Sequence, residues 1–344
     1  MRAVSDAPGP ATPAGQALAA GGRRDILSRV AERVYWLGRY IERVESTARL
    51  VTVTSNLLMD LPLRLPLGWR PLIDITGSGP LFDSLFDEAN EHNVCRFLIS
   101  DTRNPGSIIR SIEGVRENAR TVRETMPRVT FEYVNDLHHF ARSELAPGTS
   151  RRRRREALDG VGSRVHQFEG FLSRNMLHDA HWTFLRLGNQ LERADMTTRT
   201  IDVGSANLLT GHDLEAFHEA QWRSVLISLY AMQSYHAAVG QPVSRAPVLE
   251  FLLRAGHLPR SYARCLAQMR SSVRDLPRNR RPMRNCNSAI VALANADVTG
   301  LEGPTLRAFM DDCQKHLGRI HDSVAETWFH FQPKPNPKDG KLAS

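Results

Sequence analysis

Two stretches of the chain repeat one pattern of acidic and basic residues. Residues 37–49 read LGRYIERVESTAR, and residues 187–199 read LGNQLERADMTTR. In each, two carboxylates and an arginine follow a glycine at spacings of four, three and four, which places all four on one stripe of a helix. Carboxylates gathered in this way could do general acid–base chemistry or bind an amine or a metal. The members are Gly38, Glu42, Glu45 and Arg49 in the first stretch and Gly188, Glu192, Asp195 and Arg199 in the second.

The first stripe belongs to a long predicted helix. Apolar residues recur at spacings of four and three from Val30 to Val51, and this pattern predicts a helix from about 28 to 60 that buries one face. A glycine inside a helix costs about 1 kcal/mol relative to alanine. Its presence at the same place in both stretches predicts that another backbone approaches closely there.

The rest of the chain also predicts helices, so the expected fold class is all-α. Alternating runs of β-branched residues bounded by tight-turn dipeptides, which would indicate strands, are nearly absent. Helical periodicity recurs in the ranges 80–90, 107–126, 129–144, 154–175, 179–208, 213–238, 246–255, 260–275 and 301–330.

A second pair of matching segments indicates an internal duplication. Residues 94–107 read VCRFLISDTRNPGS and residues 248–261 read VLEFLLRAGHLPRS, so both end in Pro-x-Ser with the same internal spacing. The serines, Ser107 and Ser261, are expected to cap the helices that follow. Two matched blocks in the same order predict two repeats, at about 28–127 and 178–276, that form a helical bundle with pseudo-two-fold symmetry.

Composition predicts one globular domain at 23–332 with disordered tails at 1–22 and 333–344. The formal net charge is +8, and the five arginines of 151–155 contribute strongly to it; this run is assigned to a loop. The four cysteines do not have metal-binding spacing and are expected to be reduced thiols in a cytoplasmic protein. No segment has the length and apolar character of a membrane span, so no membrane partner is expected.

The repeated acidic stripes have three interpretations. In the first, two related helices cross at their glycines, and acids and arginines pair across a structural polar seam. In the second, the carboxylates converge on a polar cavity that binds an amine, a peptide or a metal. The third, a di-iron site, is disfavoured because it requires Glu-x-x-His, and the residue three after Glu42 or Glu192 is Glu45 or Asp195. We therefore predict no metal.

Motifs for common chemistries are missing from the sequence. The chain has no phosphate-binding Gly-x-x-x-x-Gly-Lys-Ser/Thr loop, no Gly-x-Ser-x-Gly elbow and no His-Glu-x-x-His. No nucleophile–base pair is recognisable, so we expect no cofactor and lean against catalysis. Aromatic residues are not interleaved with the arginines of 151–155, which makes nucleic acid an unlikely partner.

Four segments closely resemble the bacterial alpha-E domain family. They are LSRVAERVYWLGRYIERVESTARL, FLISDTRNPGSIIRSIEGVRENARTVRE, FLRLGNQLERADMTTRTIDV and FLLRAGHLPRSYARCL, and the resemblance runs from about Leu27 to His330. The family is helical, and its activity is generally unassigned. Its genes commonly neighbour a circularly permuted ATP-grasp ligase and a transglutaminase-like peptidase. The resemblance therefore implies a role in a peptide- or amide-forming system.

The resemblance also marks candidate site residues. They form a binding or structural seam in which no catalytic residue is assigned. The family's pattern falls on Glu42, Glu45, Arg49, Asp101, Asn104, Glu117, Asn118, Arg120, Glu192, Asp195 and Arg199.

The leading hypothesis is an accessory protein of an ATP-grasp peptide ligase, which binds the ligase or its peptide substrate through the polar seam. One alternative is an enzyme that acts on an amide or amine. In that case Glu42, Glu45, Glu192 and Asp195 would serve as acid–base residues, and arginines would orient a carboxylate. The other alternative is a basic helical protein that binds nucleic acid.

Overall fold

The computed structural model describes residues 26–60, 68–206 and 215–330, and within these ranges the fold is all-α, without strands. This confirms the fold class expected from the sequence. The two tails that were expected to be disordered lie outside the described residues.

The first group of helices is built around the long helix that carries the first acidic stripe. That helix begins at Ser28 and ends at Asp60, as its apolar periodicity predicts. The group consists of α2 (Ser28–Asp60), α3 (Arg70–Ile75), α4 (Gly79–Asp83), α5 (Glu91–Ile99), α6 (Ile108–Thr121), the 3-10 turn η2 (Arg123–Thr125), α7 (Arg128–Glu144) and α8 (Arg151–Asn175).

The second group is built in the same way around the helix that carries the second stripe. It consists of α9 (Ala180–Ala206), α10 (Glu215–Ser228), α11 (Met232–Ala238), α12 (Arg245–Arg254), α13 (Tyr262–Arg274), α14 (Arg280–Asn295), α15 (Gly303–Val324) and the π-helical turn η3 (Ala325–Phe329).

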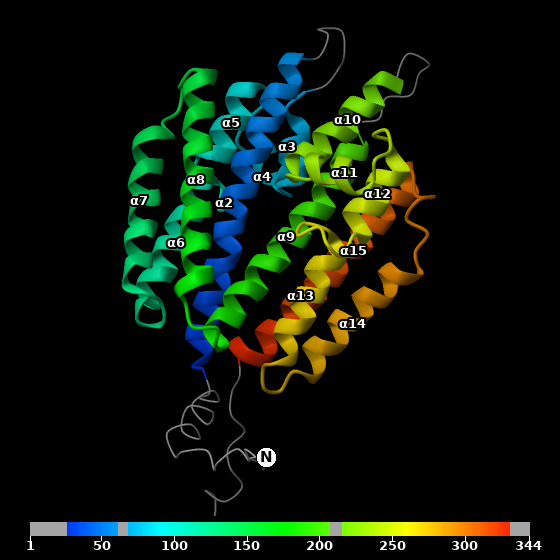
Figure 1. Ribbon diagram of the computed structural model, residues 1–344. Helices are drawn as coiled ribbons and strands as arrows, with labels where there is room; N and C mark the ends of the chain where they lie inside the picture. The colour runs from blue at the N-terminus through cyan, green and yellow to red at the C-terminus, as the bar shows by residue number, and fades with distance from the viewer. Residues whose placement is uncertain (1–25, 61–67, 207–214, 331–344) are drawn as a thin grey trace, which may run out of the picture.

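The two groups have the same order of neighbouring helices. In the first, α2 packs against α6 and α8, and α7 packs against both of these; in the second, α9 packs against α13 and α15, and α14 packs against both of these. The two groups lie on either side of the α2–α9 pair (Figure 1). This order supports the duplication inferred from the sequence, which a superposition of the two halves would test.

The central helices cross at the two repeated glycines. A Cβ atom on Gly38 would lie 2.1 Å from the carbonyl oxygen of Leu185, and one on Gly188 would lie 2.1 Å from that of Tyr35. Real Cβ atoms do not approach a carbonyl oxygen so closely, so only glycine fits at either position. The close backbone approach predicted from the two glycines is therefore present, and each helix supplies one of them.

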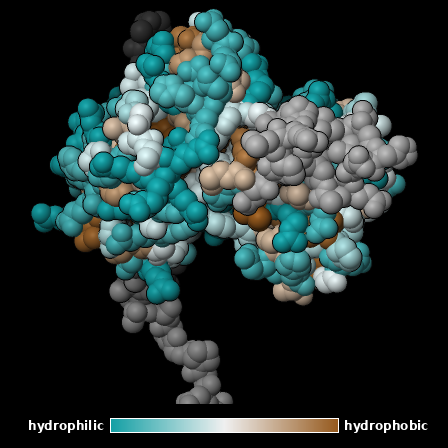
Figure 2. Space-filling model, turned by 90° about the horizontal axis from the view of Figure 1, so that it is seen from above, coloured by the Kyte–Doolittle hydropathy of each residue, from teal (hydrophilic) through white to brown (hydrophobic). Residues whose placement is uncertain are grey.

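A continuous hydrophobic core joins the two groups. The apolar stripe of α2 is buried in it from Val34 to Val51, together with the matching stripe of α9 from Phe184 to Ile201. Outside the core the surface is largely hydrophilic, with scattered hydrophobic residues, as Figure 2 shows for one face. The two groups therefore share one core rather than having two separate ones.

Some helix boundaries differ from the sequence prediction. The range 80–90 is not one helix, because α4 ends at Asp83 and α5 starts after Asn90, whose side chain caps it by accepting a hydrogen bond from Asn93 N at 2.9 Å. The range 213–238 is interrupted at Tyr230, which has a positive φ of 52°. Helix α14 was not predicted at all.

The arginine run lies at the start of a helix and not in a loop. Arg151 is the first residue of α8, and the Ser150 hydroxyl caps that helix by accepting from Arg153 N at 3.4 Å. Arginine is a good helix former, and the preceding serine provides the start signal. Arg151 and Arg154 both bind Glu91 of α5, so part of the run's charge is neutralised within the protein.

Candidate functional site

The two acidic stripes meet beyond the glycine crossing and exchange partners. Glu42 of α2 accepts hydrogen bonds from Nε and Nη2 of Arg193 on α9, at 3.0 and 2.5 Å. Glu192 of α9 accepts from Nε and Nη2 of Arg43 on α2, at 2.6 and 3.1 Å. Each glutamate is thus held by the arginine that follows the other glutamate in sequence. The Arg43–Glu192 pair is bidentate, whereas both nitrogens of Arg193 donate to Oε2 of Glu42; charge-assisted hydrogen bonds of either kind are strong.

Glu192 is fully paired and stays ionised. It is 2 % exposed, and Nε of Arg39 donates a further hydrogen bond to it at 2.6 Å. Burial alone would raise the pKa of Glu192, but the charges of Arg39 and Arg43 outweigh burial and lower that pKa to about 2.

Around Glu42 and Glu45, the seam is closed by residues from the second half of the chain. Arg260 bridges the two carboxylates, with Nη1 2.6 Å from Oε1 of Glu42 and Nη2 2.8 Å from Oε2 of Glu45. Arg49 donates to Glu45 and to the carbonyl oxygen of Ser228. Burial would raise the pKa of Glu42 and of Glu45, yet the surrounding guanidiniums hold both below their ordinary value. We call this arrangement the closed site.

Helix α8 adds two titratable groups to the closed site that the sequence did not indicate. Glu169 accepts a hydrogen bond from Nδ2 of Asn189 at 2.7 Å, and burial together with the nearby charge of Glu42 raises its pKa to about 6. Nε2 of His166 lies 3.6 Å from Oε1 of Glu45, and the interaction with that carboxylate raises the pKa of the imidazole. Neither residue belongs to a repeated motif, so only packing could show them.

At the second stripe, the seam opens into a cavity of about 500 Å³. Asp195 and Arg199 line it as a pair, with Nε of Arg199 3.0 Å from Oδ2 of Asp195. Glu192 also lines it, and two glycines, Gly77 and Gly106, form part of the opposite wall. We call this cavity the open site.

The remaining predicted residues are distributed between the open site, buried positions outside it and the surface. Asn104 lines the open site and orders its loop, accepting from Gly106 N at 2.9 Å. Asp101 is buried but pairs with Arg103 in the same loop. Asn118 accepts from Arg33 on α2 at 3.3 Å.

Two of the predicted residues lie on the surface, away from the seam. Glu117 and Arg120 form a pair with each other on the exposed face of α6, at 2.9 Å. Arg120, which the sequence offered as a partner for the seam carboxylates, does not reach them. The guanidinium that does so comes instead from Arg260, in the Pro-x-Ser segment of the second repeat.

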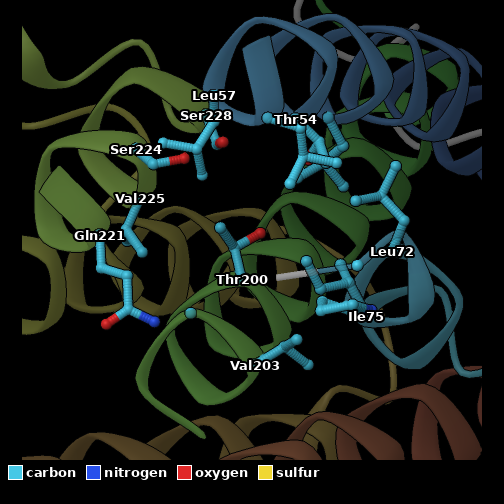
Figure 3. A pocket seen from close by; sticks show the side chains of 15 residues that line it. Thr54, Leu57, Leu72, Ile75, Thr200, Val203, Gln221, Ser224, Val225 and Ser228 are labelled. Atoms are coloured by element: carbon cyan, nitrogen blue, oxygen red, sulfur yellow. The ribbon is translucent and has the colours of Figure 1, made fainter. Parts of the chain in front are cut away.

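A second, smaller cavity of about 70 Å³ is largely apolar and lies between α2, α3, α9 and α10. Leu72, Ile75, Val203 and Val225 point into it, and the hydroxyl of Thr200 lies at its edge (Figure 3). None of its lining residues is charged, so it provides apolar contacts and no ionisable group.

Comparison with known families agrees with the resemblance of the motifs. Residues 26–329 match the Alpha-E family, described as a predicted alpha-helical domain with a conserved ER motif. The chain belongs to the Alpha-E family. In this Alpha-E domain, the Glu-Arg dipeptides 42–43 and 192–193 are the two that exchange partners across the crossing.

The relatives of this Alpha-E domain are longer proteins. Uncharacterized proteins of Mycobacterium bovis and Mycobacterium tuberculosis are 25% and 24% identical to it over 319 residues, which cover 87% of this chain and 36% of each relative. The chain therefore spans about a third of the length of the curated relatives it matches. No solved structure matches this chain.

Two further findings concern the helices and the cysteines of this Alpha-E domain. Among the described helices, none combines the length and the apolar character that a membrane crossing requires. The four cysteines are free thiols and all are buried.

Proposed function

We propose that this Alpha-E domain is an accessory protein of an ATP-grasp-type, amide-forming ligase, and that it binds a segment of the ligase or of its peptide substrate at the open site. The observation that carries the proposal is the contrast within the seam. Its buried carboxylates are paired with arginines, while one end remains a polar cavity large enough for part of a peptide. The buried part is thus a scaffold, and the cavity is the place for a ligand.

The state of the carboxylates favours binding over catalysis. A general acid or base works best with a pKa near the operating pH. The pKa of Glu192 is about 2, and burial of Glu42 is outweighed by Arg193 and Arg260, which hold its pKa well below the ordinary value. Neither group exchanges a proton readily near pH 7.

A catalytic role is the second candidate, and Glu169 is the observation that favours it. Burial raises the pKa of this carboxyl to about 6, which suits proton transfer near neutral pH. Glu169 lies on the closed side of the seam, next to Asn189 and Glu42, and not on the open site. The binding role is therefore the better supported of the two.

The length of the relatives supports a partnership. In those proteins the matched region is about a third of a longer chain, so the domain exists there together with further sequence. We infer that the domain works beside a partner, held either by covalent linkage or by association. We place this association in the cytoplasm, where the four buried thiols would remain reduced.

The test is capture of the partner from the host cell. Tagged protein is purified from its own host, the captured proteins are identified by mass spectrometry, and a captured ligase is rebound as a purified protein. The same is done with the double variant Glu42→Gln and Glu192→Gln, which keeps shape and removes both buried charges, and with Glu117→Gln as an exposed control outside the seam.

We expect the ligase to be captured by the native chain and by the Glu117 variant. The double variant should be less stable and should capture less of it. If no ligase is captured by the native chain, the proposed function is wrong. If the double variant is as stable as the native chain and binds equally well, the seam has neither of the roles given to it here.

A further inference from the structure

The closed and open sites stand at matched positions, but different residues line them. Arg260 directly precedes Ser261, which caps α13, and its side chain fills the space between Glu42 and Glu45. The matched position before Ser107, the cap of α6, is Gly106, which lines the open site. The side chain that fills the closed site therefore has no counterpart in the open one.

The turns that lie over the two sites also differ. Tyr230 follows α10 with a φ of 52°, and its ring lies over the guanidinium of Arg49, 4.4 Å from ring centroid to Cζ. Gly77 follows α3 with a φ of 67°, and a Cβ there would lie 2.7 Å from Nη1 of Arg199, the counterpart of Arg49. The two turns thus lie over matched arginines. The ring of Tyr230 covers Arg49, whereas the residue over Arg199 is a glycine.

Matched threonines also lie near the two loops. Thr197 Oγ1 donates to the carbonyl oxygen of Arg260 at 3.0 Å. Thr47, which holds the same place on α2, lines the open site beside Gly106. The cavity is therefore located where the arginine side chain would be if the first half had one.

The charges of the open site define its ligand. In the closed site, the carboxylates of Glu42, Glu45 and Glu169 face three guanidiniums, those of Arg49, Arg193 and Arg260, with the half-exposed His166 at the edge. In the open site, the carboxylates of Glu192 and Asp195 face three guanidiniums, those of Arg39, Arg43 and Arg199. The lining of the open site therefore has one positive charge in excess.

Part of this excess charge is free to bind. Arg39 and Arg43 both pair with the buried Glu192. Within the described part of the chain, the hydrogen bond of Arg199 to Asp195 involves its Nε, and neither of its Nη atoms donates a hydrogen bond. Its side chain is 29% exposed, so a ligand can reach it.

We propose that the open site binds the free carboxylate of a short peptide or amino acid on the exposed Arg199, in the cavity that the missing side chain at Gly106 leaves accessible. Arginine is suited to a carboxylate because its planar fork donates two parallel hydrogen bonds. Asp195, at the same edge, accepts an N–H of the ligand. The inference rests on the proposed function for its use of this cavity and adds the chemical class of the ligand.

The first experiment places a carboxylate in the open site by substituting a residue of the chain itself. The φ of Gly106 is not positive, and a Cβ there would approach only Oδ1 of Asn104, at 3.3 Å, so the loop can accept a side chain. Gly106→Glu brings a carboxylate to the open site, Gly106→Gln is its neutral match, and Gly106→Arg has the opposite charge. We expect Gly106→Glu to melt at least about 2 °C above Gly106→Gln, and Gly106→Arg to melt below it. Equal melting temperatures for the Glu and Gln variants would contradict an anion site.

The second experiment uses ligands and the intact chain. Trialanine, its C-terminal amide, its N-acetyl form and inorganic phosphate are titrated by calorimetry. We expect trialanine and its N-acetyl form to bind, the amide to bind at least about tenfold more weakly, and Gly106→Glu to lose binding of all of them. Phosphate binding as tight as that of trialanine would overturn the peptide assignment, as would equal binding of the amide or no binding of trialanine.

These experiments can contradict the proposed partner and the proposed ligand independently of each other. Carboxylate binding by purified protein without capture of a ligase would leave the site assignment standing and remove the proposed partner. Capture of a ligase that is unaffected by Gly106→Glu, together with no response to trialanine, would keep the partner and remove the site assignment.

Discussion

Arg260 shows how one side chain can determine the character of a polar interior. It donates to Glu42 and to Glu45, and without it two buried carboxylates would lose a shared partner. An unpaired buried charge costs several kcal/mol, whereas an exposed pair contributes little. At this scale, the seam is stable because Glu42, Glu45 and Glu192 each have at least one guanidinium of their own.

We predict that Arg260→Ala lowers the free energy of unfolding by about 3–5 kcal/mol. The measurement is urea unfolding followed by circular dichroism. Arg103→Ala is the control, because Arg103 also pairs with a buried carboxylate, Asp101, but its own side chain is half-exposed. A loss of stability in the control as large as in Arg260→Ala would mean that burial of the guanidinium is unimportant.

Glu169 should make stability depend on pH in an unusual direction. Burial raises its pKa from 4.5 to about 6, so the folded state keeps this proton in a pH range where the unfolded chain has released it. The stabilisation is therefore complete below about pH 4.5 and is lost as the pH rises through 6. Glu169→Gln should add about 1–2 kcal/mol to the free energy of unfolding at pH 7.5.

The check is urea unfolding of native and Glu169→Gln protein at pH 4.5 and at pH 7.5. The hydrogen bond from Asn189 is retained by the amide oxygen, so the variant changes charge and little else. The two proteins should be equally stable at pH 4.5. A difference of the same size at both pH values would rule out the titration of Glu169 as its cause.

At the scale of elements, the crossing of α2 and α9 depends on two glycines. Gly38 faces the carbonyl oxygen of Leu185, and Gly188 faces that of Tyr35, both at a distance that leaves no room for a methyl group. The helices must therefore separate before either position can accept a side chain. Since Glu42 and Glu192 are bound across the same crossing, separation would also lengthen their hydrogen bonds.

Gly38→Ala should therefore destabilise the protein by about 3 kcal/mol, the upper end of the usual cost of overfilling a well-packed interior. Gly170→Ala is the matched control: it also replaces a helical glycine, but a Cβ there would have no neighbour within 4 Å. The control should be stabilised by about 0.5–1 kcal/mol through helix propensity. Thermal unfolding of both variants tests this, and opposite signs are the expected result.

The sequence predicted the elements whose patterns are local. The apolar stripe of α2, the glycine crossing and the capping serines Ser107 and Ser261 were all readable, because each depends on spacing within one segment. Helix α14 was missed although its buried residues, Pro282, Cys286, Ala289 and Leu293, recur at helical spacing. The bridging role of Arg260 was missed because it contacts residues more than 200 positions away.

At the scale of the whole molecule, the two helical groups share one core and one seam. We predict that they unfold together. Hydrogen exchange measured by mass spectrometry at increasing guanidinium concentrations should show loss of protection at the same midpoint for peptides from α6 and α13. Separate midpoints would indicate that each group is a domain with its own stability.

The exchanged Glu–Arg pairs also have a consequence for synthesis. Glu42 leaves the ribosome long before Arg193, and the arginine that completes its pairing follows 218 residues after it. At about 5–20 residues per second, that interval is about 10–40 seconds. During this time, Glu42 lacks both of its arginine partners, and burying its charge would be unfavourable. Folding of the first half must therefore remain reversible during translation, and the chain becomes committed to its native structure only when the second half has emerged.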